Sequence, residues 1–269
     1  MHIVYIFRHS VHGDEELRFS LRSVRAHLPF VERVWIFGDR PVWLGESDYV
    51  RVVAHEEIAW LLGLRTPVVN GLLMHVLVAL LPELPEEFLM LCDDYILLAS
   101  ASEEDLRRVR YVEDLAKVQR RGRGLWKESL WRTYETLRRR EYSGLNFETH
   151  VPAWHTKRRV LAAYRDLRDF VSQDRYYGLL ANTAIYNHAL KREPLDLVHR
   201  EADGRYAGFY ERPYSSEEIA ARAAGKTFLN FDDRAYNDAM RQFLAERFPE
   251  PAPWETDNAA PGGNPIPRV

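Results

Sequence analysis

The chain has 269 residues, of which 46% are hydrophobic and 29% charged, and its formal net charge is -3. These values are typical of an ordinary globular protein and exclude a globally basic nucleic-acid-binding protein, so any nucleic-acid contact must come from local patches. A single cysteine, Cys92, excludes an internal disulfide framework. Without a long apolar run or the features of a signal peptide, the sequence predicts a cytoplasmic protein.

Three apolar runs before residue 60 predict β-strands, at residues 3–7, 33–37 and 50–54. A helix over residues 15–27, between the first two strands, is predicted by apolar residues that recur with helical spacing. This alternation of strand and helix is the opening of an α/β layered fold.

The first predicted helix also carries arginines on a second face, among them Arg18 and Arg22. Such a stripe is most often a solvated helix face, but the guanidinium group also matches the geometry of phosphate. We expect Arg18 and Arg22 to face the phosphates of a bound diphosphate. Arg8, Asp39 and Asn70, which flank predicted strands or helices, are expected to complete the site of that ligand.

The strongest chemical signal is the run Phe88–Leu98, in which apolar residues lead directly into the adjacent carboxylates of Asp93 and Asp94. This run predicts a strand buried on both faces, with the aspartates at its carboxyl end, where open α/β sheets hold their ligands. Two adjacent carboxylates repel each other, and a divalent cation such as Mg²⁺ or Mn²⁺ relieves the repulsion. We therefore expect a metal site at Asp93 and Asp94, although two solvated aspartates would give the same pattern.

The middle of the chain, about residues 102–141, is predicted to be a helical insertion rich in arginine. Aromatic residues interleave with these arginines, a combination that nucleotide and nucleic-acid surfaces use. For any single cluster, a helix face balanced by nearby glutamates is the better interpretation. If DNA is the acceptor, the arginines expected to contact it are Arg120, Arg121, Arg123, Arg138, Arg139 and Arg140.

Candidate catalytic residues follow in the second half. Residues 146–152 alternate like a strand, which would place Glu148 and His150 on one face and raise the pKa of the imidazole. A later apolar run leads into a second carboxylate pair, where Asp233 is expected to meet the amides at the start of a helix over residues 234–248. We expect His150 to be the base and Asp233 the second carboxylate of the donor–metal site, with the exchanged roles as the alternative.

Several stretches, in order, resemble the Stealth proteins and together span roughly residues 14–255. They match the second, third and fourth conserved regions of that family, and they are residues 16–24 with 34–39, Cys92–Tyr95, 148–152, and 228–233 with 247–255. The resemblance implies a GT-A-like (Rossmann-like) mixed α/β sheet flanked by helices, with a helical C-terminal part. We expect one catalytic domain over residues 1–255 and a flexible tail over residues 256–269.

Stealth proteins are sugar-phosphate transferases that move a hexose 1-phosphate from a nucleotide sugar to a hydroxyl acceptor. The chain departs from them, because Arg8-His9-Ser10 stands where the family has a Trp-Val-Asp-Gly-type motif, and Cys92 replaces the usual asparagine. It looks closer to short, phage-encoded relatives labelled glycosyltransferases.

That resemblance implies a Mn²⁺- or Mg²⁺-dependent glycosyltransferase that moves a sugar from a UDP-sugar to a hydroxyl. Some of the phage-encoded relatives are thought to act on hydroxymethylated bases of viral DNA, so 5-hydroxymethylcytosine in bacteriophage DNA, in the host cytoplasm, is the expected acceptor. The alternative is a Stealth-like sugar-1-phosphate transferase that acts on a glycan.

Overall fold

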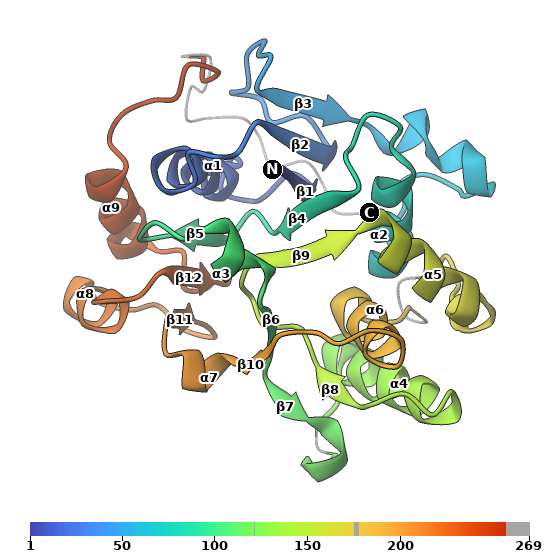
Figure 1. Ribbon diagram of the computed structural model, residues 1–269. Helices are drawn as coiled ribbons and strands as arrows, with labels where there is room; N and C mark the ends of the chain where they lie inside the picture. Colours follow the sequence, from blue (N-terminus) through green and yellow to red (C-terminus); the bar gives the residue numbers. More distant parts are fainter. Residues whose placement is uncertain (121, 175–177, 257–269) are drawn as a thin grey trace. The chain divides into compact units, whose positions relative to one another are not determined.

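The computed structural model describes residues 1–120, 122–174 and 178–256. The chain divides into two compact units (Figure 1). The first is formed by residues 1–54, residues 91–102 and the chain from residue 205 onward, and the second by residues 55–90 and 103–204. Arg121 and residues 257–269 of the predicted tail lie outside the described residues.

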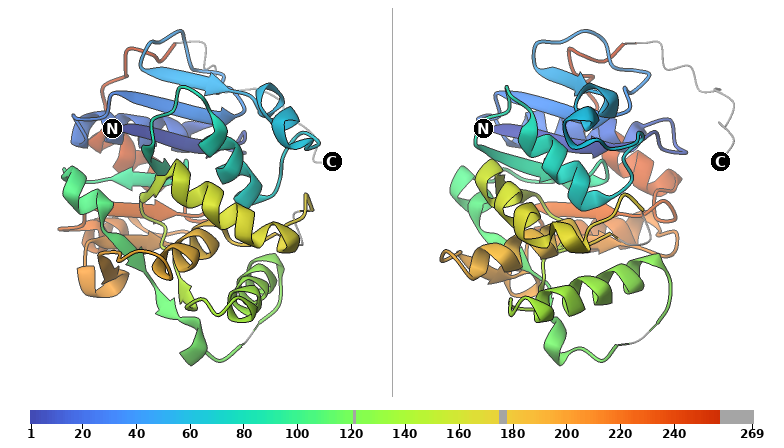
Figure 2. Two further views of the ribbon diagram at one scale, coloured as in Figure 1. Left: turned by 45° about the vertical axis from the view of Figure 1, so that its right-hand side comes forward. Right: turned by 90° about the vertical axis from the view of Figure 1, so that its right-hand side faces the viewer.

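The first unit contains three parallel strands. β1 (His2–Phe7), β2 (Arg33–Gly38) and β3 (Val50–Val53) run side by side in the order β3-β2-β1 (Figures 1 and 2). Helix α1 (Glu15–His27) connects β1 to β2, since parallel neighbours need a crossover connection. The predicted strands and helix of this region are confirmed.

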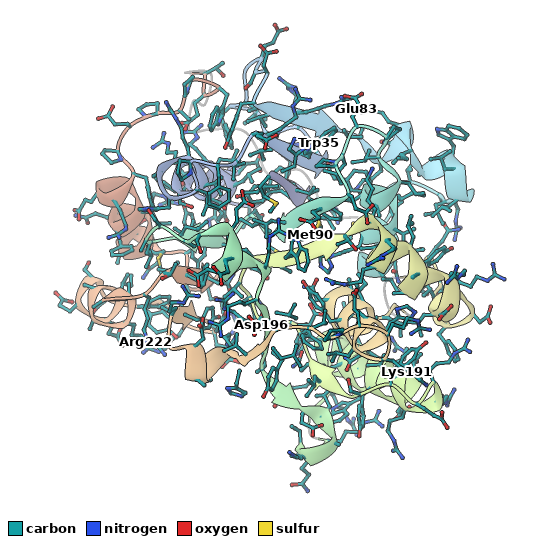
Figure 3. All side chains as sticks on the ribbon, in the orientation of Figure 1. Trp35, Glu83, Met90, Lys191, Asp196 and Arg222 are labelled. Atoms are coloured by element: carbon teal, nitrogen blue, oxygen red, sulfur yellow. The ribbon has the colours of Figure 1, made fainter. Side chains whose placement is uncertain are left out.

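The core beside these strands is closed by large side chains. Trp35, in the middle of β2 (Figure 3), is 1% exposed, and its Nε1 donates to Nδ1 of His2 at 3.1 Å. A buried indole N–H without a partner would cost free energy, so this hydrogen bond lets the largest side chain of the strand stay inside.

A second sheet in the first unit has the order β11-β12-β5. It consists of β5 (Tyr95–Leu97), β11 (Tyr206–Phe209) and β12 (Phe228–Phe231), with β12 antiparallel to β5 and parallel to β11. Helices α8 (Ser216–Ala223) and α9 (Asp238–Arg247) share one apolar cluster with it. The large buried side chains of this cluster include Ile96, Phe209, Ile219, Leu229, Phe231, Met240 and Leu244.

Helix α9 starts later than the predicted residue 234. Its N-cap is Asn237, whose side chain accepts the N–H of Met240 at 3.0 Å. Asparagine is among the best N-cap residues, so the helix begins where this cap is available.

The second unit is built around three contacting helices, α2 (Gly71–Leu80), α5 (Lys157–Leu167) and α6 (Ala181–Leu190). Strand β4 (Glu87–Leu91) pairs antiparallel with β9 (Ala153–Thr156). The shorter elements and α4 are η1 (His55–Glu57), η2 (Ala59–Leu62), α3 (Glu103–Arg107), β6 (Val109–Tyr111), β7 (Glu113–Asp114), η3 (Leu115–Lys117), α4 (Leu125–Arg139), β8 (Leu145–Asn146), η4 (Arg168–Phe170), β10 (Leu197–His199) and α7 (Arg200–Asp203).

The mixed α/β fold with flanking helices is therefore confirmed, with one change. The predicted strand that leads into Asp93 and Asp94 is β4, which ends at Leu91; the second apolar run forms β5 from Tyr95, and the N–H of Tyr95 closes a turn onto the carbonyl of Cys92 at 3.1 Å. The predicted insertion over residues 102–141 holds β6 and β7 as well as helices. Within the described ranges, no helix combines the length and the apolar character needed to cross a membrane.

Candidate functional site

A cavity of about 60 Å³ in the first unit is enclosed largely by carboxylates. The carboxylates come from the start of α1, the turn before β5 and the residues after β12, and a serine comes from the loop after β1, all within this unit. Across the described part of the chain, no lysine or arginine lines the cavity, which we call the acidic pocket. Its lining residues are Ser10, Glu16, Asp93, Asp94, Phe231, Asp232 and Asp233.

Glu16 reaches the pocket because one face of α1 is fixed onto β5. Ser20 and Ser23 lie four and seven residues after Glu16, on the same face of the helix. The hydroxyl of Ser20 donates to the carbonyl of Tyr95 at 2.5 Å, and the hydroxyl oxygen of Ser23 accepts the N–H of Leu97 at 3.0 Å. Glu16, 4% exposed, is thereby held beside the turn that carries the two aspartates.

The loop after β1 is closed around the hydroxyl of Ser10. This hydroxyl donates to Oε2 of Glu16 at 2.7 Å and accepts the N–H groups of His12 and Asp14 at 3.2 and 3.1 Å. Asp14 has a φ of 64°, in the left-handed region that a tight turn requires. The ring of His12 packs edge-on against Tyr236, with 5.0 Å between centroids. The loop therefore holds both the Glu16 carboxylate and the His12 ring.

Asp94 is positioned by a one-directional chain of hydrogen bonds. Asn230, fully buried, donates its Nδ2 to the carbonyl of Asp94 at 3.3 Å, the hydroxyl of Tyr210 bonds to Oδ1 of Asn230, and that of Tyr206 bonds to Tyr210. Because a carbonyl oxygen only accepts, Tyr210 must donate to Asn230 and Tyr206 to Tyr210. A Cβ at Gly208 would lie 2.5 Å from the Tyr206 hydroxyl oxygen, so glycine makes room for the chain.

The carboxylates of Asp232 and Asp233 have different surroundings. Oδ1 of Asp232 accepts the N–H groups of Arg234 and Ala235 at 3.1 and 3.0 Å, and Oδ2 accepts that of Glu211 at 2.7 Å. The prediction that Asp233 takes such amides is wrong, because the preceding aspartate holds them. Asp233 is exposed and lies at the mouth of the acidic pocket.

Burial and crowding raise the pKa values of three pocket carboxylates, those of Glu16, Asp93 and Asp94. Burial, with the charge of Glu16 next, raises the pKa of Asp93 to about 7. Burial and the charge of Asp93 raise the pKa of Asp94 well above its ordinary value, and burial raises that of Glu16. Oδ1 of Asp94 is buried and has no hydrogen-bond partner among the described residues. Oxygen ligands crowded in this way fit a divalent cation such as Mg²⁺ or Mn²⁺.

We expect the metal-free protein to lose stability as pH rises from about 4 to about 7. The folded pKa of Asp93, about 7, exceeds its ordinary value of 3.8, so between these values the folded chain holds a proton that the unfolded chain has lost. Stability therefore falls as pH rises through this window. Thermal unfolding at a series of pH values checks this, and Asp93→Asn should flatten the slope. A metal-free melting temperature that rises steadily over the window would contradict the raised pKa.

The arginine stripe of α1 contacts the C-terminal segment. Nε of Arg22 donates to Oε1 of Glu255 at 2.7 Å, its Nη1 donates to the carbonyl of Phe248 at 2.9 Å, and Arg18 lies 3.7 Å from Oε2 of Glu255. Neither arginine lines the acidic pocket. Their observed role is to hold the C-terminal segment on α1, and their role in donor binding stays a prediction.

Replacing Arg22 with alanine is expected to destabilise the first unit by roughly 3 kcal/mol, because it leaves the buried carboxylate of Glu255 without its main partner. Urea unfolding measures the change. Arg22→Lys should recover part of the loss, since lysine keeps the charge but not the two-pronged contact. The exposed Arg8→Ala is the control. If Arg22→Ala leaves the stability unchanged but weakens the binding of UDP, Arg22 is a donor-binding residue and the structural role is wrong.

The other expected donor-binding residues are spread over both units. Arg8 is exposed just after β1, and Oδ2 of Asp39, after β2, accepts the N–H of His9 at 3.0 Å. Asn70 belongs to the second unit, where its Oδ1 caps α2 by accepting the N–H of Leu73 at 3.0 Å. The structure gives Asn70 a capping role, and donor binding by all three stays a prediction.

The predicted strand over residues 146–152 is wrong beyond Asn146, where β8 ends. The N–H of Glu148 is taken by Oδ1 of Asn146 at 3.0 Å instead of by a neighbouring strand. The buried carboxylate of Glu148 in turn accepts the N–H of Thr183 at 3.0 Å, so it braces the start of α6 in the second unit.

His150, also in the second unit, has a pKa shifted opposite to the prediction. Burial and the nearby charge of Arg200 lower the pKa of His150 to about 4. Its φ of 56° lies in the left-handed region, which few non-glycine residues adopt. Strained backbone of this kind is found at functional sites more often than elsewhere, which keeps His150 among the catalytic candidates.

Two of the arginines expected to contact DNA are paired with acidic residues. Nη1 of Arg120 lies 2.8 Å from Oε1 of Glu135, and Nη2 of Arg140 lies 3.9 Å from Oδ2 of Asp169. Contact between these clusters and DNA stays a prediction. The remaining described arginines of this set, all exposed, are Arg123, Arg138 and Arg139.

Sequence reasoning brought Asp93, Asp94 and Asp233 to one site but missed other members. The pattern predicts no site role for Glu16, although its helical spacing to two serines marks a polar stripe beside the apolar face. No local pattern in the sequence identifies His12.

Comparison with known proteins matches part of this chain to one family. Residues 10–114 match the family described as Stealth protein CR2, conserved region 2. An exopolysaccharide phosphotransferase of Nocardia farcinica (strain IFM 10152) is 26% identical over 294 residues, which cover 94% of this chain and 55% of that protein. The capsular polysaccharide phosphotransferase LcbA of Aeromonas hydrophila is 33% identical over 84 residues, covering 30% of this chain and 23% of that protein. The chain thus spans about half the length of the first relative.

Among solved structures, an active-site mutant of LgtC aligns with a TM-score of 0.46 and 13% identity, over 91% of this chain and 95% of LgtC. Galactosyltransferase LgtC with donor and acceptor sugar analogs aligns with a TM-score of 0.45 and 13% identity, over 92% and 96%.

The region matched by the family contains Ser10, Glu16, Asp93 and Asp94, which are four of the seven residues that line the acidic pocket. The matched region of the chain therefore resembles the second conserved region of the Stealth proteins, and it carries most of the residues that line the acidic pocket.

Proposed function

We propose that this chain is a divalent-metal-dependent transferase that moves a sugar 1-phosphate from a nucleotide sugar to a hydroxyl group of a glycan. The observation that carries the proposal is the acidic pocket, with five carboxylates and a buried Asp94 oxygen that lacks a partner in the described chain. Both curated relatives are named polysaccharide phosphotransferases, which favours transfer of a sugar phosphate over transfer of a sugar alone.

In this reaction the acceptor hydroxyl oxygen forms a bond to the phosphorus next to the sugar. The bond from that phosphorus to the bridging oxygen of the diphosphate breaks, and a nucleoside monophosphate leaves. The acceptor proton passes to a base, for which His150 and Asp233 are the candidates. In the alternative, glycosyl transfer, the acceptor attacks the anomeric carbon instead, and a nucleoside diphosphate leaves.

The carboxylates of Glu16, Asp93 and Asp94 would hold the cation, which when bound neutralises the negative charge of the donor diphosphate. The Ser10 hydroxyl keeps the Glu16 carboxylate turned into the pocket. Asn230 fixes the backbone carbonyl of Asp94 by a hydrogen bond. The Asp94 side chain therefore does not have to be reoriented when the donor binds.

The leaving nucleotide distinguishes the two reactions. The protein is incubated with a panel of UDP-sugars, Mn²⁺ and either a glycan acceptor or DNA that contains 5-hydroxymethylcytosine. Release of UMP, with a product heavier by a sugar phosphate, supports the proposal. Release of UDP supports the alternative, glycosyl transfer. A DNA acceptor containing 5-hydroxymethylcytosine is expected only for that alternative. Absence of any product from a protein that binds Mn²⁺ would overturn the transferase assignment.

A further inference from the structure

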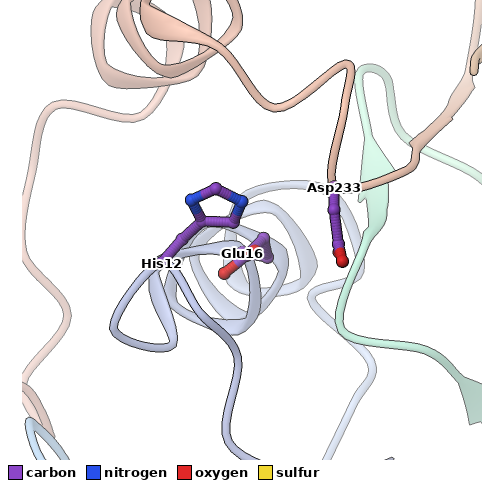
Figure 4. A group of neighbouring side chains, drawn as sticks. All are labelled: His12, Glu16 and Asp233. Carbon is purple, nitrogen blue, oxygen red and sulfur yellow. The ribbon is translucent and has the colours of Figure 1, made fainter. Parts of the chain in front are cut away.

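An imidazole stands beside the carboxylates of the acidic pocket. A ring nitrogen of His12 and carboxylate oxygens of Glu16 and Asp233 all lie within 4.8 Å of one another. Figure 4 shows the three side chains gathered from two parts of the chain, His12 and Glu16 from the loop and helix after β1, and Asp233 from the loop after β12. Both carboxylates also line the acidic pocket.

The His12 ring has an unused ligand atom. Its Nε2 is buried and has no hydrogen-bond partner in the part of the chain that the structure describes. A buried polar group left in that state costs about 1–3 kcal/mol, so a ligand to the ring nitrogen would stabilise the loop.

The spacing of the three groups matches ligands of one ion better than a hydrogen-bonded cluster. Across the described residues, no hydrogen bond joins the ring of His12 to Glu16 or Asp233, although all three converge within 4.8 Å. Two ligands that each lie about 2.1 Å from a shared cation are separated by roughly 3–4 Å, within that limit. The backbone N–H of His12 is tied to Ser10 and its ring rests on Tyr236, so the ligand is held in place.

We propose that His12, Glu16 and Asp233 form a transition-metal site in the acidic pocket, in which the His12 imidazole makes the pocket prefer Mn²⁺ or Zn²⁺ to Mg²⁺. Carboxylate and water ligands suit Mg²⁺, whereas imidazole suits the first-row transition ions. This site shares Glu16 with the carboxylates proposed to hold the cation of the transferase, and it adds His12 and Asp233 as ligands. Its place in the reaction rests on the proposed function, but it is tested by metal binding, without turnover.

The test is pulsed electron paramagnetic resonance of the metal-stripped protein loaded with Mn²⁺. The intact chain is expected to show ¹⁴N coupling from a directly bound imidazole. His12→Ala should lose this coupling and bind Mn²⁺ at least about tenfold more weakly, while its affinity for Mg²⁺ changes less than about twofold. His12→Gln, which keeps a polar side chain in the loop, should also lose the coupling and serves if the alanine variant does not fold.

The matched control is His9→Ala, in the same loop, which should keep the nitrogen coupling because Nδ1 of His9 is bonded to Asp14 instead. Coupling that is absent from the intact protein, or that survives in both His12 variants, overturns the proposal. Equal losses of Mn²⁺ and Mg²⁺ affinity would also overturn it. Nitrogen coupling without any transfer activity would leave this site standing and reject the proposed function, whereas transfer without coupling would do the reverse.

Discussion

Asp94→Asn is expected to lower the transfer rate by on the order of 10³-fold while the fold remains intact. The substitution removes a charge without changing the volume of the side chain. The Asp94 carboxylate is buried next to another negative charge, because both burial and the charge of Asp93 raise its pKa. The amide relieves that repulsion, so the melting temperature of the metal-free variant should equal or exceed that of the original protein.

Turnover at saturating Mn²⁺, Mn²⁺ affinity and thermal melting together measure the effect. Asp48→Asn, an exposed change in the same unit, is the matched control and should leave all three unchanged. Asp93→Asn should behave like Asp94→Asn, with a smaller loss if it mainly holds the donor ribose. Full turnover of Asp94→Asn at saturating Mn²⁺ would remove Asp94 from the metal site.

Elements whose pattern is local were predictable from the sequence. The helix Glu15–His27 agrees with its prediction at both ends, because its apolar residues recur with helical spacing and acidic residues fill its first turn. The buried strands β1 and β2 are continuous apolar runs for the same local reason.

Elements fixed by distant partners were not predictable. The alternation after Asn146 resembles a strand, but the N–H of Phe147 is taken by the side-chain oxygen of Thr183, 36 residues away, at 3.1 Å. Alternation describes which side chains are apolar, and it does not say whether a neighbouring strand is available. The carboxylate that binds Arg22 comes from Glu255, 233 residues away, so the stripe could not be assigned from α1 alone.

The residues of the candidate site also fall into those predictable from local sequence and those fixed by distant contacts. Asp93, Asp94 and Asp233 follow apolar runs, and the expectation that they share a site agrees with the acidic pocket that they line. Glu16 and Asn230 join them only because Ser20 and Ser23 hold α1 on β5 and because β12 pairs with β5. Such contacts join segments that are far apart in the sequence, and composition and local spacing do not specify them.

Replacing His150 with asparagine is expected to cost roughly 10²–10⁴-fold in kcat if His150 is the base. Asparagine tolerates the left-handed backbone that this residue adopts, so the variant removes the imidazole without adding strain, whereas alanine would combine both effects. The second unit should therefore keep its melting behaviour.

The pH dependence of the rate then identifies the group that accepts the proton. Only the neutral imidazole accepts one, and burial together with Arg200 lowers the pKa of His150 to about 4, so the neutral form persists down to that pH. The acidic limb of the kcat profile should therefore lie near pH 4, and not near the ordinary imidazole value, and it should vanish in His150→Asn. Asp233→Asn is the paired variant, and it should lower the rate while keeping the limb. If the limb survives in His150→Asn and disappears in Asp233→Asn, Asp233 is the base and His150 has another role.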